Sequence, residues 1–163
     1  MKKILTVLLA AVLAAGSMSA KEYQHSLGMV AGLGIGAQYK TMVMPNFTII
    51  EEFGYTVCPT QTAGAGGYDG MLDNLVLAYQ ATCAEGQGIR LDWYAGGQIK
   101  LGYGIGSYGI FGIGGAAGIE AIMTNAPIAF SFDFRPGYGC LFASGGAGHT
   151  FDYTLNLGVR YTF

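Results

Sequence analysis

Apolar and polar residues alternate with a period of two along most of the chain, which is typical of β-strands whose two faces meet different surroundings. The longest uninterrupted run is 151–163, where every odd position is aromatic or aliphatic and every even position is polar or glycine. A tilted strand needs about 10 such residues to cross a bilayer. The pattern therefore predicts that the chain ends in a membrane-crossing strand.

The same alternation occurs in seven earlier segments, and stretches rich in Gly, Pro and Asn separate them. We expect the connections at Gly34–Gly36, Pro45–Asn46, Pro59–Gly70, Glu85–Gly88, Gly104–Tyr108, Asn125–Pro127 and Ala143–His149. Seven connections imply eight strands, with about 18 residues for each strand and its connection, as in the smallest membrane barrels. The predicted fold is all-β, an eight-stranded antiparallel up-and-down transmembrane β-barrel.

The N-terminus has the pattern of a secretory signal peptide. Lys2 and Lys3 precede the apolar stretch Ile4–Ala15, and small residues follow up to Ala20. The apolar stretch is too short to span a bilayer as a helix. We therefore expect a cleavable signal peptide at 1–20 and a barrel domain at 21–163.

Composition narrows the class of protein further. Apolar residues make up 52% of the chain and charged residues only 11%, against about 25% charged in soluble domains, which excludes disorder. The net charge of −2 and the lack of a basic cluster argue against nucleic acid as a partner. Because no second long apolar run is present to make a spanning helix, a closed β-barrel is the remaining route across a bilayer.

Most of the charged residues fall on the face opposite the apolar one, five bases and five acids in equal number. They are Lys40, Glu52, Arg90, Asp92, Lys100, Glu120, Asp133, Arg135, Asp152 and Arg160. In a barrel with its apolar face toward lipid, these side chains fill the lumen as a balanced charge network. Eight strands enclose only enough space for their own side chains, so we predict a closed lumen.

The alternation alone does not say which face is inside. A soluble secreted β-sandwich or lipocalin-like binder has its apolar face inside and its charged face outside. The signal peptide, the low charge and the strand count favour the membrane barrel. One residue fits poorly, because Glu51 alternates with Ile49 and Phe53 and so faces lipid. Either a β-bulge at Ile50–Glu52 or a different register would remove this conflict.

Several segments resemble known proteins. The signal peptide and the segment Leu155–Phe163 are similar to those of Gram-negative outer-membrane β-barrels. The alternating Tyr161 and the terminal Phe163 resemble the signal that the barrel-insertion machinery reads. Further segments resemble the small OmpX/OmpA-like barrels: Gly36–Lys40, Gly118–Glu120 and Pro127–Pro136. The resemblance covers most of the mature chain and implies this fold and an outer-membrane location, but no particular activity.

Candidate reactive residues are few. His149 has Ser144 and Asp152 nearby in a segment expected to be a loop, and such a set near a barrel rim would suit a lipid-modifying enzyme. A single histidine in a loop is more often only solvated, so we predict no enzyme. Cys58, Cys83 and Cys140 are odd in number and poorly placed to pair, so we expect free thiols. No metal-ligand spacing occurs, and we expect neither metal nor cofactor.

These observations predict a small monomeric outer-membrane barrel with a side-chain-filled lumen and a structural or interaction role. Its expected partners are outer-membrane lipid and, during assembly, the barrel-insertion machinery. Two alternatives remain: a narrow channel for small or apolar solutes, and a lipid-modifying outer-membrane enzyme.

Overall fold

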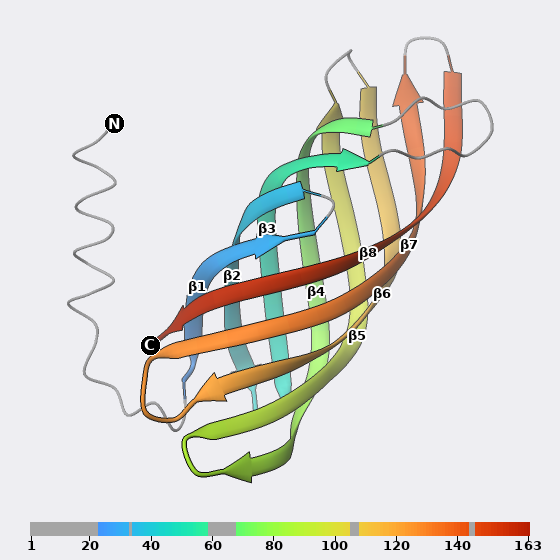
Figure 1. Ribbon diagram of the computed structural model, residues 1–163. Coiled ribbons are helices and arrows are strands. Elements are labelled where there is room, and N and C mark those ends of the chain that lie inside the picture. The colour runs from blue at the N-terminus through green and yellow to red at the C-terminus, as the bar shows by residue number, and fades with distance from the viewer. Residues whose placement is uncertain (1–22, 33, 59–67, 105–107, 144–145) are drawn as a thin grey trace, which may run out of the picture.

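The computed structural model describes residues 23–32, 34–58, 68–104, 108–143 and 146–163, so the predicted signal peptide lies outside the described residues. Eight strands make up the fold: β1 His25–Ala31, β2 Gly34–Met44, β3 Phe47–Cys58, β4 Tyr68–Gly86, β5 Ile89–Gly104, β6 Tyr108–Met123, β7 Ile128–Ala143 and β8 Gly146–Thr162. Each strand pairs antiparallel with the next, and β8 pairs with β1 to close the barrel (Figure 1). The predicted eight-stranded up-and-down barrel is confirmed.

Short connections mark one end of the barrel, which we call the turn rim. They lie at 45–46, 87–88 and 124–127, close to the predicted turns, and the C-terminus lies at the same end. Asn46 and Gly88, the second residues of their two-residue connections, have positive φ angles of 68° and 91°, which Asn and Gly adopt most readily in tight turns. At the opposite end, which we call the loop rim, β1, β3, β5 and β7 end.

On the loop rim the strands begin earlier than predicted. Gly34 already belongs to β2, Tyr68 to β4 and Gly146 to β8. Gly34 is needed for close strand contact rather than for a turn, because a Cβ there would lie 2.1 Å from the carbonyl oxygen of Tyr55 on β3. His149 consequently lies within β8 and not in a loop.

The outer surface of the barrel is apolar and the inner surface is polar. Leu157 is 64% exposed and Phe132 44%, whereas Arg135 is 1% exposed. This is the reverse of a water-soluble β-sandwich or lipocalin-like protein, so that alternative is wrong. The predicted assignment, with the apolar face outward toward lipid, is confirmed.

The wall of the barrel is uneven in height. β5 to β8 have 16 or 17 residues each, whereas β1 has seven. At about 3.3 Å per residue and a tilt of about 40°, 16 residues rise about 40 Å, more than the roughly 30 Å of a hydrocarbon core. The long strands extend beyond β1 and β2 at the loop rim (Figure 1).

Glu51 points outward from the middle of β3. The pairing of β2 with β3 runs without interruption from Gly34 to Met42, and the irregularity lies between Met42 and Met44. Neither of the two alternatives, a β-bulge at Ile50–Glu52 or a different register, applies, and Glu51 faces outward as the simple alternation predicts. Ile50 and Glu52 are both buried in the lumen, and this forces the residue between them outward.

No helix long and apolar enough to cross a bilayer occurs in the part of the chain that the structure describes.

An arginine on the outer surface tests the lipid-facing assignment. Leu77 lies near the middle of β4 and is 56% exposed. We expect Leu77→Arg to lower the free energy of unfolding by about 2–4 kcal/mol in lipid vesicles, because the charge enters hydrocarbon. Urea unfolding followed by the fluorescence of Trp93 measures the change. Leu77→Met, the control, should change it little, and equal stability of the two variants would place this surface in water.

Candidate functional site: the lumen

All ten charged residues predicted for the lumen lie on the inner face of the barrel. Eight of them are buried, and Arg90 and Asp152, which lie toward opposite rims, are partly exposed. Arg90 pairs with Asp92 at 3.1 Å, and Lys100 with Asp152 at 2.7 Å. The remaining six charges gather in the centre and on the turn side of the lumen.

The first bridge across the lumen joins β7 to β3. Both terminal nitrogens of Arg135 donate to the carboxylate of Glu52, at 2.5 and 2.6 Å, and its Nε donates to Asp133 at 2.7 Å. β3 and β7 are four strands apart in a ring of eight, so they form opposite walls. The two-pronged ion pair of Arg135 with Glu52 therefore crosses the full width of the lumen.

The second bridge joins β2 to β6, again opposite walls. Lys40 donates to Glu120 at 2.5 Å, and Arg160 on β8 donates to the other oxygen of the same carboxylate. Tyr23 also donates to Glu120, at 2.7 Å, and Gln80 does so at 3.1 Å. Four donors from different parts of the chain therefore stabilise one buried carboxylate.

Uncharged polar residues join the two bridges. Gln38 donates to Glu52 and accepts from Arg160, and Tyr94 donates to Asp133 at 2.6 Å. We call the connected group the ion plug: Gln38, Lys40, Glu52, Tyr94, Glu120, Asp133, Arg135 and Arg160. Its three positive and three negative charges balance, so the buried group is neutral.

Sequence reasoning missed Tyr23 and the linking role of Gln38. Tyr23 stands just before β1, where no alternating pattern includes it. Burial, together with the charge of Glu120, raises the pKa of the Tyr23 hydroxyl, which therefore stays protonated and donates a hydrogen bond to the carboxylate. Gln38 was visible only as one polar residue on the inner face, because its partners lie on distant strands.

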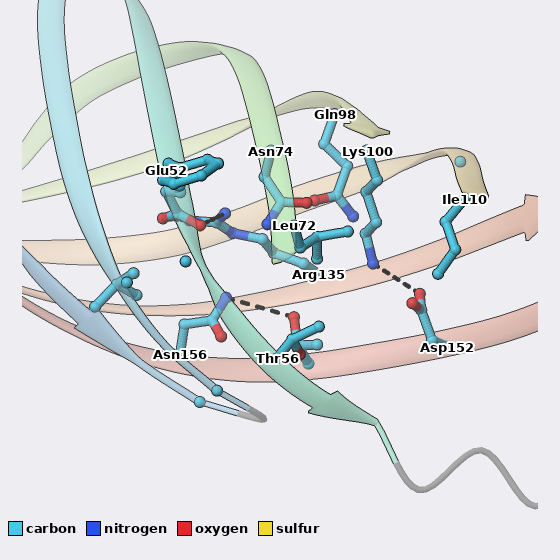
Figure 2. A pocket seen from close by; sticks show the side chains of 18 of the residues that line it. Glu52, Thr56, Leu72, Asn74, Gln98, Lys100, Ile110, Arg135, Asp152 and Asn156 are labelled. Carbon is cyan, nitrogen blue, oxygen red and sulfur yellow. Dashed lines mark hydrogen bonds and ion pairs between the residues drawn. The ribbon is translucent and has the colours of Figure 1, made fainter. Parts of the chain in front are cut away.

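The lumen is filled on the turn side but hollow on the loop side, which corrects the expectation that side chains fill it throughout. A partly open cavity of about 90 Å³ lies there, and residues of all eight strands line it. Figure 2 shows Glu52 with Arg135 on one side of this cavity and Lys100 with Asp152 on the other. Glu52 and Arg135 thus belong to the ion plug and to the cavity wall at once.

The structure does not bring the candidate catalytic residues together. The ring of His149 stacks on Tyr138 on the outer surface, with centroids 5.8 Å apart, and its Nδ1 lies 3.4 Å from the Sγ of Cys140. Asp152 points the other way, into the lumen toward Lys100. Ser144 lies outside the described residues.

The cysteines and the other histidine have simple surroundings. Cys83 and Cys140 are free thiols, and the side chain of Cys58 is outside the part that the structure describes. His25 lies 2.8 Å from the hydroxyl of Tyr39 and 3.0 Å from that of Thr41. Within the described ranges, no three His, Cys, Asp or Glu side chains gather in a way that could hold a metal ion.

Comparison with solved structures finds bacterial outer-membrane proteins. A major outer membrane protein from Thermus thermophilus is similar over 85% of this chain and 98% of its own, with 14% identity and a TM-score of 0.48. The Yersinia pestis outer membrane protein Ail, solved in a phospholipid bilayer nanodisc, is similar over 87% and 100%, with 14% identity and a TM-score of 0.35. No protein-family model and no curated protein matches the chain. Its own closed sheet, apolar exterior and charged lumen make it a small β-barrel of the outer-membrane type.

Removing one member of the ion plug should destabilise the barrel more than removing a rim charge. Glu120→Ala leaves Lys40 and Arg160 buried without their common partner, so we expect a loss of about 3–5 kcal/mol in the free energy of unfolding. Asp152→Asn removes the charge of a partly exposed carboxylate but keeps an oxygen that can accept from Lys100, so it should cost about 1 kcal/mol. Urea titration in lipid measures both values, and similar losses would show that the central charges are solvated.

Proposed function

We propose that the protein is an integral outer-membrane barrel that is closed to ions and serves a structural or interaction role in the cell envelope. The observation that carries this proposal is the pair of bridges across the lumen, Arg135 to Glu52 and Lys40 to Glu120. Each bridge joins opposite walls of the barrel. An ion could pass only by breaking them.

The energetics of the bridges favour a closed state. All four of these residues are at most 4% exposed, so water screens their attraction little. Separating a buried ion pair leaves two uncompensated charges in a medium of low polarity, which costs several kcal/mol. A barrel with this lumen does not let ions pass.

The outer surface supports a location in the outer membrane with lipid as its main partner. Aliphatic side chains cover the exterior together with aromatic ones such as Trp93, Phe130 and Tyr153. Such a surface suits acyl chains in the middle and headgroups at the edges. Since the closed sheet has no free edge where β1 meets β8 on the turn side, we propose a monomer.

The upper part of β8 supports the interaction role. Within the described residues, β1 pairs only with Leu157–Thr162 of β8, so 146–156 extend past the end of β1. The backbone groups of such a strand edge are open to pairing with another chain. The loop rim is therefore the end of the barrel where we expect contacts with other proteins.

Conductance measurements test the closed lumen and the channel alternative together. We expect the wild-type barrel to give no current steps in planar bilayers. A variant without both bridges should conduct, because four long side chains are shortened while the lumen stays neutral. It carries Lys40→Ala, Glu52→Ala, Glu120→Ala and Arg135→Ala. The migration of heated and unheated samples on gels verifies that the barrel is folded.

The matched control for this variant is Lys100→Ala with Asp152→Ala. It removes one base and one acid from the inner face, half as many of each as the fourfold variant, and both lie outside the ion plug. We expect it to remain closed. Current through the wild-type protein would favour the narrow channel. A fourfold variant that folds but gives no current would show that the two bridges are not what closes the lumen.

We also propose that Phe163 has two roles, in recognition by the insertion machinery and in closing the barrel. Its backbone N–H donates to the carbonyl of His25 at 2.8 Å, and its carbonyl accepts from His25 at 3.0 Å. Phe163→Ala keeps these backbone bonds but removes the terminal ring. We expect a severalfold drop in the amount assembled in outer membranes, measured by fractionation.

Phe151→Ala is the matched control, because it removes an outward aromatic ring from the loop end of the same strand. It should assemble at the wild-type level. An equal drop in both variants would mean that Phe163 acts only as part of the apolar surface.

A further inference from the structure

The cavity on the loop side of the ion plug has features that a purely structural barrel does not need. We propose that it is a closed-ended binding pocket for a small neutral amphiphile, with a hydrogen-bond-donating head such as an alcohol at the floor and a short apolar tail toward the loop rim. This goes beyond the proposed structural role. It does not depend on whether the ion plug conducts, because the pocket lies on one side of it.

Paired glycines create the space. On one wall, Gly36 of β2 faces Gly54 of β3 across the strand pair, and on the opposite wall Gly112 of β6 faces Gly139 of β7. All four line the cavity. Two facing walls therefore lack side chains at the same part of the lumen, and the space between them stays open.

The floor of the pocket presents two acceptors without partners. The side-chain oxygens of Asn74 and Gln98 are buried and have no hydrogen-bond donor among the described residues, and Gln98 is only 3% exposed. The amide nitrogen of Gln98 donates to the carbonyl of Pro136 at 3.3 Å, so its oxygen is the end of the amide that has no partner. Both residues line the pocket, and Figure 2 shows their amide oxygens turned toward each other.

These two oxygens lie close enough to serve one ligand. Asn74 pairs with Lys100 and Val76 pairs with Gln98 across β4 and β5, so Asn74 and Gln98 occupy diagonal positions on the inner face. A buried acceptor without a donor costs about 1–3 kcal/mol in general. A ligand that donates a hydrogen bond removes that cost, whereas one that only accepts cannot.

The charges of the lining favour a neutral ligand. Four charged residues line the cavity, and each already has an opposite partner: Arg135 with Glu52, and Lys100 with Asp152. A charged ligand would have to compete with one of these pairs. A neutral donor leaves both of them intact.

The apolar lining lies nearer the loop rim than the amides. β4 runs from the loop rim to the turn rim, so Leu72 lies above Asn74. Ile110 near the start of β6 and Leu141 near the end of β7 line the same upper part. An apolar tail that extends upward from the amides is therefore shielded from water.

The size of the pocket sets the length of the ligand. Its volume of about 90 Å³ corresponds to about six to nine water molecules. A linear molecule with about seven non-hydrogen atoms matches this space. 1-Hexanol, methyl pentyl ether and hexylammonium all have that size, and they differ only in the head: a neutral donor, a neutral acceptor and a charged donor.

Titration of the reconstituted barrel with these three compounds tests the proposal. The readout is the side-chain amide signals of Asn74 and Gln98 in NMR spectra of the protein in nanodiscs. We expect 1-hexanol to shift both signals in a saturable way and to bind about fivefold more tightly than the ether, as one hydrogen bond predicts. Hexylammonium should bind more weakly than 1-hexanol.

Two variants locate the binding site. Gln98→Leu removes one acceptor and should abolish the preference for the alcohol over the ether. In this variant the affinities are measured from the side-chain amide signal of Asn74. Thr154→Phe fills the pocket from β8 and should remove saturable binding altogether. Thr48→Val is the control, because it replaces a buried polar side chain with an apolar one of similar shape on the inner face, outside both the pocket lining and the ion plug. Binding should be unchanged in this control.

Several results would overturn the proposal. A shift that does not saturate, or that persists in Thr154→Phe, would mean that the compounds only enter the bilayer. Equal affinity of the alcohol and the ether would remove the role of the amide oxygens, and tighter binding of hexylammonium would show that the site prefers a cation. A loss in Thr48→Val as large as in Gln98→Leu would mean that the effect is not local.

Discussion

Charge neutralisation across the lumen is the constraint on which the rest of the structure depends. Lipid requires an apolar exterior, so the ionised side chains that the barrel buries must face its narrow interior. A buried charge there is tolerated only with partners at short distance. Glu120 has partners from β2 and β8 and Arg135 has them from β3 and its own strand. These contacts tie strands that never pair with each other, and so they hold the register of the whole barrel.

The behaviour of Glu51 shows how strongly the interior decides the register. An acid on a lipid-facing surface is unfavourable, and a bulge would have relieved it. The regular pairing is kept instead, because a shift of one residue would turn Glu52 away from Arg135 and expose Ile50. On β4, Asp73 likewise stands between the cavity-lining Leu72 and Asn74 and faces outward. Interior pairing outweighs two unfavourable exterior positions.

The inner surface is divided along its length into a neutral half that ion pairs cross and an open half. Long side chains from opposite walls meet in the first, and facing glycines leave space in the second. The same glycines bring strands close together, as at Gly36, where a Cβ would lie 2.8 Å from the carbonyl oxygen of Phe53. Close contact between strands and the open space of the pocket therefore have one cause, the missing side chains. In a barrel of eight strands, a pocket can form only where the inward positions lack side chains.

The sequence by itself determined the number of strands, the turn-rim connections and the face on which each charge lies, because alternation and turn residues are local properties. It did not predict that Arg135 meets Glu52, that Gln38 links the two bridges, or that His149 and Asp152 occupy opposite faces of one strand. It also placed Gly34 in a turn and expected a filled lumen. Those features depend on which residues face each other across the closed barrel. That follows from the pairing register of all eight strands together, which only the tertiary structure decided.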